Sequence, residues 1–145
     1  MLNEGITEFD ERLVKATALD GIGFQELHCS VPLNGVPNGT EFTPKFQLCI
    51  ARSSEDTNRF RVAITCELQN ESGVKILVTA YGVYHVEDEN LLPLEDKAIE
   101  EYVNLVAASH LMPYIRQAIA DITSRVAGNS LTLPVYKLGD LHFRA

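Results

Sequence analysis

Cysteine and histidine are the residue types in this sequence that most readily do chemistry, yet their spacing matches no familiar site. The three cysteines, Cys29, Cys49 and Cys66, are far apart, and each lies in a strand-like run. A zinc site needs ligands paired at short spacing, and the sequence contains no Cys-x-x-Cys. His28 is next to Cys29, but adjacent strand residues point to opposite faces of a sheet. We therefore interpret the cysteines as buried or half-buried structural residues.

The acidic residues predict neither a metal site nor a catalytic pair. His85 is closely followed by the acidic run 87–89 at the end of an apolar stretch, where such a run is typical of a solvated turn. Glu100 and Glu101 are neighbours on an expected helix, so their side chains diverge and cannot act together as acid and base. The glycines of the segment 33–43 are not followed by Gly-Lys-Ser/Thr, as a phosphate-binding loop requires. We expect no catalytic residue, no metal and no cofactor.

The formal net charge of -8 restricts the partners that the chain can bind. Nucleic acid binding needs clustered Lys and Arg, and an acidic chain is also repelled by anionic membrane surfaces. The sequence does not open with a basic segment followed by an apolar run, and no stretch approaches the roughly 18 apolar residues of a membrane span. We therefore expect a cytoplasmic protein that binds neither nucleic acid nor membrane.

The length predicts a single domain over residues 1–145. Inside 1–20, apolar residues at helical spacing predict a short N-terminal helix, with Asn3 or Thr7 as candidate caps. At the other end, we expect 137–145 to be a loose tail. The loop 33–43 contains Asn-Gly twice in a long irregular stretch, and loops of this length tend to be functional.

Alternating apolar residues predict an antiparallel sheet. The segment Asp-Gly-Ile-Gly at 20–23 predicts a break before the first strand, whose alternation is imperfect and which Pro32 ends. A short turn at 70–73 predicts a hairpin between the last two strands. The predicted strands are 24–31, 45–52, 59–69 and 74–86.

Two helices are predicted after the strands. The first begins near Leu94 and extends to Val106. In the second, Pro113 can occupy the first turn, Ser109 is a plausible cap, and Gly128 can end the helix in a left-handed turn. Strands followed by helices indicate an α+β fold. We predict a four-stranded antiparallel sheet with one long and one shorter helix packed on one face.

The strand predicted at 74–86 is apolar on both faces, so both of its faces should be covered. Two helices in one chain can hardly cover both, and this predicts an oligomer. The predicted subunit contacts are Ile76, Val78 and Ala80 of this strand and Ile115, Ile119 and Ile122 of the last helix.

Three sequence blocks resemble the C-terminal signature of the SecB family of export chaperones and of the SecB-like chaperones of toxin–antitoxin systems. They are Met-Pro-Tyr-Ile-Arg at 112–116, Asp-Ile-Thr-Ser-Arg at 121–125 and Leu-Thr-Leu-Pro at 131–134. Glu-Phe-Thr-Pro-Lys-Phe-Gln-Leu at 41–48 is similar to the end of the family's crossover loop and its second strand. The likeness covers residues 24–136, and it departs from the family at 126–130, where family members usually have a Gly-Gly-Phe-Pro-Pro-like link.

The resemblance implies an ATP-independent holdase that binds unfolded polypeptides in a hydrophobic groove. It also implies a homodimer or a dimer of dimers, with a linked antitoxin as a further candidate partner. The groove would be bordered by the crossover loop and the extended tail. The implied client-binding residues are Phe42, Phe46, Leu131, Leu133, Val135 and Tyr136.

Two departures argue against docking on the translocase motor of protein export. Lys75 and Leu77 stand where the family's acidic docking surface would be, and no second C-terminal helix follows 131–136. We therefore expect export activity to be weak or missing. One alternative is a small-molecule-binding protein or enzyme with a pocket between sheet and helix. Another is a structural oligomer that kept the fold without the activity.

Overall fold

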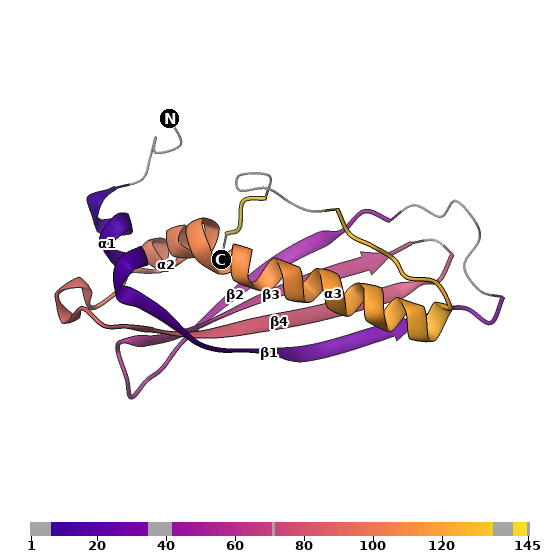
Figure 1. Ribbon diagram of the computed structural model, residues 1–145, viewed down its shortest axis with the longest axis horizontal. Helices are drawn as coiled ribbons and strands as arrows, with labels where there is room; N and C mark the ends of the chain where they lie inside the picture. The colour runs from indigo at the N-terminus through magenta and orange to yellow at the C-terminus, as the bar shows by residue number, and fades with distance from the viewer. Residues whose placement is uncertain (1–6, 35–41, 71, 135–140, 145) are drawn as a thin grey trace.

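The computed structural model describes residues 7–34, 42–70, 72–134 and 141–144. Figure 1 shows an elongated molecule in which one long helical rod runs along a twisted sheet. The elements in chain order are α1 (Glu8–Ala16), β1 (Thr17–Ser30), β2 (Lys45–Arg52), β3 (Arg59–Gln69), β4 (Lys75–Val86), the 3-10 turn η1 (Glu89–Leu91), α2 (Asp96–Tyr102), the π-helical turn η2 (Val103–Ala107) and α3 (Ala108–Ala127).

The four strands form one antiparallel sheet in the order β1-β4-β3-β2, which confirms the predicted fold class. In its centre, Ile64 lies opposite Ala80 and Cys66 lies opposite Val78. The predicted hairpin joins β3 to β4: Gly73 has φ +91°, and its N–H donates to the carbonyl of Asn70 at 3.3 Å. A positive φ of this size suits glycine because it has no Cβ.

The start of β1 differs from the prediction. The strand begins at Thr17 and passes through 20–23, so the predicted break there is wrong. The register with β4 shifts between Leu19 and Gly21 and again between Phe24 and Glu26, which leaves Asp20 and Gln25 without a partner residue opposite. These are β-bulges, in which an extra residue is inserted without ending the strand.

The two predicted later helices are one continuous helix of 32 residues, from Asp96 to Ala127. Ser109 is not its cap, because this residue lies within the helix and its hydroxyl donates to the carbonyl of Val106 at 2.6 Å. Pro113 is also inside the helix. Its missing N–H leaves the Ser109 carbonyl without a helical partner, but both residues are exposed, so water can serve it. Gly128 ends the helix at φ +81°, as predicted.

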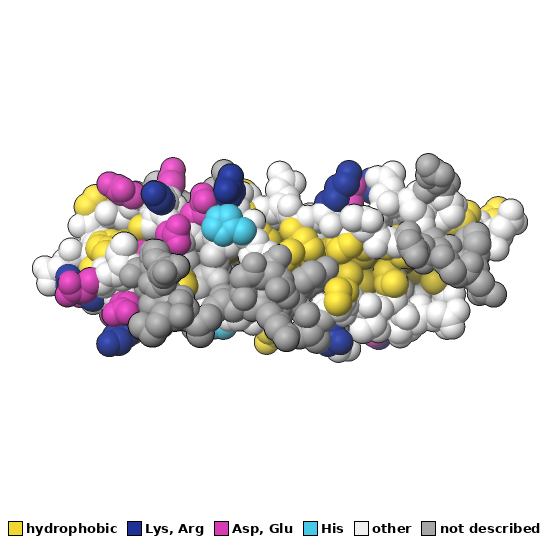
Figure 2. All heavy atoms as spheres, turned by 90° about the horizontal axis from the view of Figure 1, so that it is seen from above, with side chains coloured by type: hydrophobic (Ala, Val, Ile, Leu, Met, Phe, Trp, Pro, Cys, Tyr) yellow, Lys and Arg dark blue, Asp and Glu magenta, His cyan; other side chains and the backbone are white. Residues whose placement is uncertain are grey.

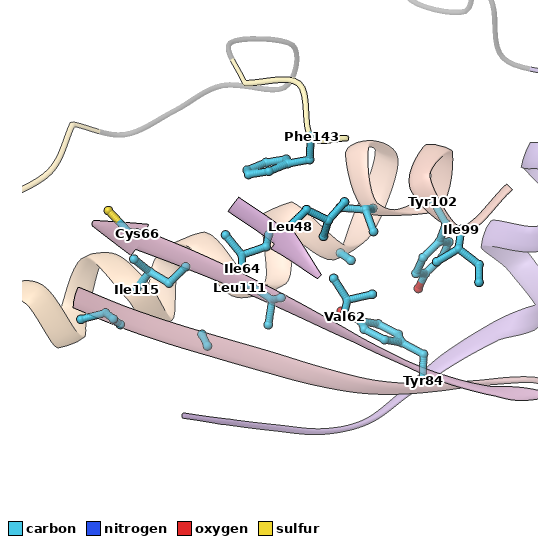
Figure 3. Packing of buried hydrophobic residues seen from close by; sticks show 14 of the residues in the cluster. Leu48, Val62, Ile64, Cys66, Tyr84, Ile99, Tyr102, Leu111, Ile115 and Phe143 are labelled. Carbon is cyan, nitrogen blue, oxygen red and sulfur yellow. The ribbon is translucent and has the colours of Figure 1, made fainter. Parts of the chain in front are cut away.

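The main core lies between the sheet and this long helix, and Figure 3 shows part of it. An aromatic group fills one end: the ring of Tyr84 stacks on Phe60 at 5.3 Å and meets Tyr102 edge-on at 5.4 Å. The Tyr84 hydroxyl also lies 3.1 Å from Nδ1 of His110. Other fully buried side chains include Val62, Ile64, Cys66, Leu68, Ile76, Val78, Ala80, Leu111, Ile115 and Ile119.

The opposite face of the sheet carries no helix within the described parts of the chain. Tyr81 lies on this face, where the guanidinium carbon of Arg61 sits 3.6 Å from the centre of its ring. Thr65 and Thr79 share a hydroxyl–hydroxyl hydrogen bond of 2.7 Å across neighbouring strands. Small, polar and cation-paired side chains therefore limit the apolar area that this face exposes.

Candidate functional site

An apolar groove lies between the free edge strand β1 and the outer side of α3. Its volume is about 460 Å³. Phe24 and Leu27 come from β1, and Tyr114 comes from α3; their exposed fractions are 41%, 51% and 47%. The rings of Phe24 and Tyr114 meet at 6.4 Å across the groove. Clustered exposure of large apolar side chains in this way is typical of an interaction surface.

The second bulge of β1 sets the direction of two of these side chains. Phe24 and Leu27 are three positions apart, so a regular strand would point them to opposite faces. Because Gln25 is inserted between Phe24 and Glu26, Phe24 lies opposite Ala80 and Leu27 opposite Val78. Both therefore face α3, on the same side as the core.

Polar side chains of α3 also line this groove. Gln117, Asp121 and Arg125 line it together with Ala118 and Ile122. Arg125 forms an ion pair with Asp121, with Nε 3.3 Å from Oδ2. Both side chains are largely exposed, so this pair adds little stability.

On the other side of α3, the extended segment 131–134 is fixed to the helix by hydrogen bonds. Nε of Arg116 donates to the carbonyl of Leu133 at 2.8 Å. The hydroxyl of Thr123 accepts from the N–H of Leu131 at 2.8 Å and donates to the carbonyl of Ile119 at 2.6 Å. The segment after α3 is thus held along the helix with Leu133 buried.

Phe143 also packs on the side of α3 where the segment 131–134 lies. Its ring meets Phe46 of β2 edge-on at 6.2 Å, and Figure 3 shows it pointing into the core from the segment after α3. Asn104 holds its backbone: Oδ1 accepts from the N–H of Phe143 at 2.7 Å, and Nδ2 donates to its carbonyl at 2.9 Å. The prediction of a loose tail is therefore wrong for residues 141–144; residues 137–140 and 145 lie outside the described parts.

Of the predicted client-binding residues, Phe46, Leu131 and Leu133 lie on this side of α3, and they are less open than expected. Leu133 is buried, whereas Phe42, Phe46 and Leu131 are half-buried against the core. Phe42 is therefore not a freely exposed loop residue. Val135 and Tyr136 lie outside the described residues. Figure 2 views the molecule from above Figure 1 and shows a stripe of hydrophobic side chains. In Figure 1, this upper side carries β2 and the segment after α3.

Most residues predicted at a subunit contact lie inside the chain's own core, so this prediction needs correction. A side chain with no exposed surface cannot contact a second subunit. The apolar face of α3 and the face of β4 that carries these residues are covered by packing within one chain. The residues concerned are Ile76, Val78, Ala80, Ile115 and Ile119. Only Ile122 of the predicted set lines the groove beside β1.

The groove beside β1 was missed in the sequence. Leu27 and Phe24 were assigned only to a strand, and Tyr114 only to a family signature. The available signal was the single-residue slip in the alternation of β1, which indicates a bulge. The exposure of these side chains depends on where α3 crosses the sheet, which no local pattern encodes.

The cysteines and His85 sit in ordinary structural surroundings. Burial raises the pKa of the Cys66 thiol to about 12, so it stays protonated at neutral pH. Cys29 is half-buried, but Cys49 is exposed, contrary to prediction. His85 lies between two carboxylates, with Nδ1 2.7 Å from Asp20 and Nε2 3.3 Å from Glu87. No group of three or more metal-ligating side chains that could hold a metal ion occurs among the described residues.

Comparison with known proteins supports the fold and goes no further. No family model matches the sequence, and no curated protein matches it. A solved SecB-like chaperone of Mycobacterium tuberculosis, bound to a ChAD peptide from the HigA1 antitoxin, superposes with a TM-score of 0.74 at 20% identity. The match covers 89% of this chain and 94% of that one. The SecB-like fold implied by the sequence resemblance is therefore confirmed.

A second solved structure, a protein of unknown function from Streptococcus agalactiae, gives a TM-score of 0.41 at 16% identity over 82% of this chain and 97% of that one. That similarity is too low to bear on fold or function. Separately, none of the helices within 7–34, 42–70, 72–134 and 141–144 is long and apolar enough to cross a membrane.

Proposed function

We propose, from the premise that this chain has the fold of a SecB-like chaperone, that it is an ATP-independent holdase for non-native polypeptides. The observation that carries the proposal is the similarity of nearly the whole chain to a chaperone solved with a polypeptide segment bound. Two apolar surfaces flank α3, and such surfaces suit adaptable capture of extended chains better than a single defined reaction. The proposal includes no chemical step.

The client surface that we propose is the side of α3 that faces β2. Phe42, Phe46 and Leu131 are half-buried there, and Leu133 and Phe143 form a fixed floor beneath them. Binding of a client to these partly exposed apolar side chains would be favoured by about 25 cal/mol of free energy for each Å² of apolar surface that it buries. The proposed surface also includes Val135 and Tyr136, on the basis of the sequence resemblance.

The groove beside β1 is our proposed site of self-association. β1 is an edge strand of 14 residues, and a free edge of this length presents unpaired backbone groups. Antiparallel pairing with β1 of a second copy would satisfy those groups. It would also bury Phe24, Leu27 and Tyr114, the exposed apolar residues of the groove. A homodimer follows, and pairing of two dimers would give a tetramer.

An antitoxin segment is the native client that we propose, because the similar structure holds an antitoxin peptide.

The translocase motor is a weaker candidate. On the sheet face away from α3, Lys75 and Arg61 are both exposed, and Leu77 lies next to Lys75 in β4. Glu26 and Glu67 also lie on this face, so the two cations interrupt the acidic surface that motor docking implies. We also propose a cytoplasmic location.

Suppression of aggregation without nucleotide tests the proposed activity. A denatured acidic model protein is diluted into buffer with the chaperone, and light scattering records how much of it aggregates. We expect the wild type to suppress scattering. Phe42→Ser and Leu131→Ser should weaken suppression per folded molecule, because each removes apolar area from the proposed client surface. Circular dichroism supplies the folded fraction.

Phe9→Ser is the matched control, because Phe9 is an exposed aromatic residue on α1, and α1 lies at the end of the molecule opposite the start of β2. This variant should suppress aggregation as well as the wild type does. Scattering unaffected by the wild-type protein would overturn the holdase proposal and leave only a shared fold. Equal losses in Phe9→Ser and Phe42→Ser would show that the client surface is elsewhere.

A further inference from the structure

A second cleft lies at the far end of the molecule, between α1 and α2, away from both surfaces that flank α3. Its volume is about 480 Å³. Phe9, Pro93 and Ala98 form its apolar lining. The ring of Phe9 remains 38% exposed, although Leu13 on the same helix is fully buried. The proposed holdase activity uses none of these residues.

The local sequence fixes α1 rigidly beside this cleft. Thr7 and Asp10 form a reciprocal cap: the hydroxyl of Thr7 accepts from the N–H of Asp10, and the carboxylate of Asp10 accepts from the N–H of Thr7, both at 3.1 Å. Such a cap satisfies two backbone donors and sets the angle at which the helix begins. The other end of α1 is tied down, since the carbonyl of Ala16 accepts from the N–H of Glu87 at 2.7 Å. The cleft is therefore preformed.

The rim of the cleft is predominantly acidic. Asp10, Glu95 and Glu101 line it, against the single cation Lys97. Asp10 is engaged in the cap, whereas Glu95 and Glu101 form no ion pair within the described part of the chain. Figure 2 shows carboxylates at this end of the molecule, with Lys and Arg side chains among them. A net negative charge around an apolar lining favours an occupant of the opposite charge.

We propose that the cleft between α1 and α2 binds a cationic segment of a partner polypeptide, with an apolar side chain against Phe9 and flanking Lys or Arg residues beside Glu95 and Glu101. Charge selects this occupant over a second copy of the chain. The net charge of -8 and the acidic residues at this end would make two copies repel each other here. The site does not depend on the holdase activity, since it shares no residue with the surface assigned to clients.

Binding of a labelled peptide tests the proposal. The probe is a short fluorescein-labelled peptide with a central Leu-Phe pair between arginine flanks, and its counterpart has glutamate flanks. Fluorescence anisotropy with the full-length protein should detect the arginine peptide and not the glutamate peptide. Raising the salt concentration should weaken binding, because salt screens the attraction between the carboxylates of the cleft and the arginine flanks.

Variants assign the binding to the cleft. Glu95→Gln combined with Glu101→Gln should lower affinity about 5-fold, the effect of losing two exposed ion pairs. Phe9→Ala should lower it by a similar factor through loss of the apolar anchor. Glu26→Gln combined with Glu67→Gln is the matched control: it removes the same charge from the outer sheet face and should leave affinity unchanged.

Two results would overturn the proposal. One is an equal loss of affinity in the control pair, which would show attraction to net charge alone. The other is full competition by spermine with no effect of Phe9→Ala, which would show binding of a simple polycation. The aggregation assay on the same variants separates the two sites, because the cleft variants should retain full suppression of an acidic client.

Discussion

The side-chain amide of Asn104 bonds to both backbone groups of Phe143, 39 residues further along the chain. The same Nδ2 also donates to the carbonyl of Glu100 at 2.9 Å. Asn104 is in the π turn η2, and turns of this kind occur often at functional positions of helices. From this irregular turn, the side chain of Asn104 bonds both to its own helix and to the segment that contains Phe143.

Replacement of Asn104 by alanine should destabilise the fold. The change removes three hydrogen bonds and leaves partly buried backbone groups of Phe143 without partners, which costs about 1–3 kcal/mol for each unsatisfied group. Urea unfolding followed by circular dichroism measures the free energy of unfolding. Asn90→Ala, at an exposed position in η1, is the control and should change it by less than about 0.5 kcal/mol. Equal effects of the two variants would contradict this role of Asn104.

Two glycines should respond differently to alanine, because the rings above them differ in freedom. A Cβ at Gly82 would lie 2.8 Å from the ring of Tyr84, which is fully buried and stacked on Phe60. Gly82→Ala should therefore cost about 1–3 kcal/mol of stability by overpacking. A Cβ at Gly23 would come equally near the ring of Tyr81, but that ring is only half-buried and can swing outward. Thermal unfolding should show a clearly smaller loss for Gly23→Ala, and the reverse order would be inconsistent with this packing.

Stability should fall at alkaline pH. Burial raises the pKa of Cys66 from 9.0 to about 12 and that of Tyr102 from 10.0 to about 12. Burial and the nearby Tyr102 also raise the pKa of Tyr84. Above pH 9 the unfolded chain therefore releases protons that the folded chain keeps, and unfolding becomes more favourable by up to about 1.4 kcal/mol per pH unit for each group.

Tyr102→Phe removes one of these groups. Its free energy of unfolding, measured by urea titration from pH 9 to 11, should decline less steeply than that of the wild type. Parallel pH profiles would show that Tyr102 ionises equally in both states.

Two aspartate variants should separate folding from association. Val78 is fully buried, so Val78→Asp should cost several kcal/mol and unfold the chain. Leu27 is half exposed, so Leu27→Asp should stay folded. Sedimentation should show the wild type as an oligomer and Leu27→Asp as a monomer. A folded oligomeric Leu27→Asp would place the subunit contact away from the groove beside β1.

Much of the fold could be predicted from local patterns. The strands β2, β3 and β4 follow from alternation, and Gly128 follows from its place after the last apolar turn. The single long helix could not be predicted in the same way, because the π turn at 103–107 shifts the helical period. In the sequence, that shift has the same pattern as a gap between two helices. Ser109 follows it at the position where a helix cap would stand.

The site was less predictable, because it depends on contacts between distant segments. Nothing near Phe143 in sequence indicates Asn104 as its partner. Periodicity identified Ile115 and Ile119 as one apolar face, but it could not say whether the chain itself or a second copy covers that face. The sheet of the same chain covers it.

The strand order β1-β4-β3-β2 also sets a sequence of events for a chain emerging from the ribosome. β2, β3 and β4 can pair in turn as successive short-range neighbours, at low entropic cost. β1 is translated before them, yet its partner is β4, so its pairing must wait until the other three strands exist. Its apolar residues Phe24 and Leu27 stay unpaired throughout that interval. The strand whose outer edge we propose for a second copy is therefore also the last to join the sheet, so the proposed dimer surface is complete only when the monomer is.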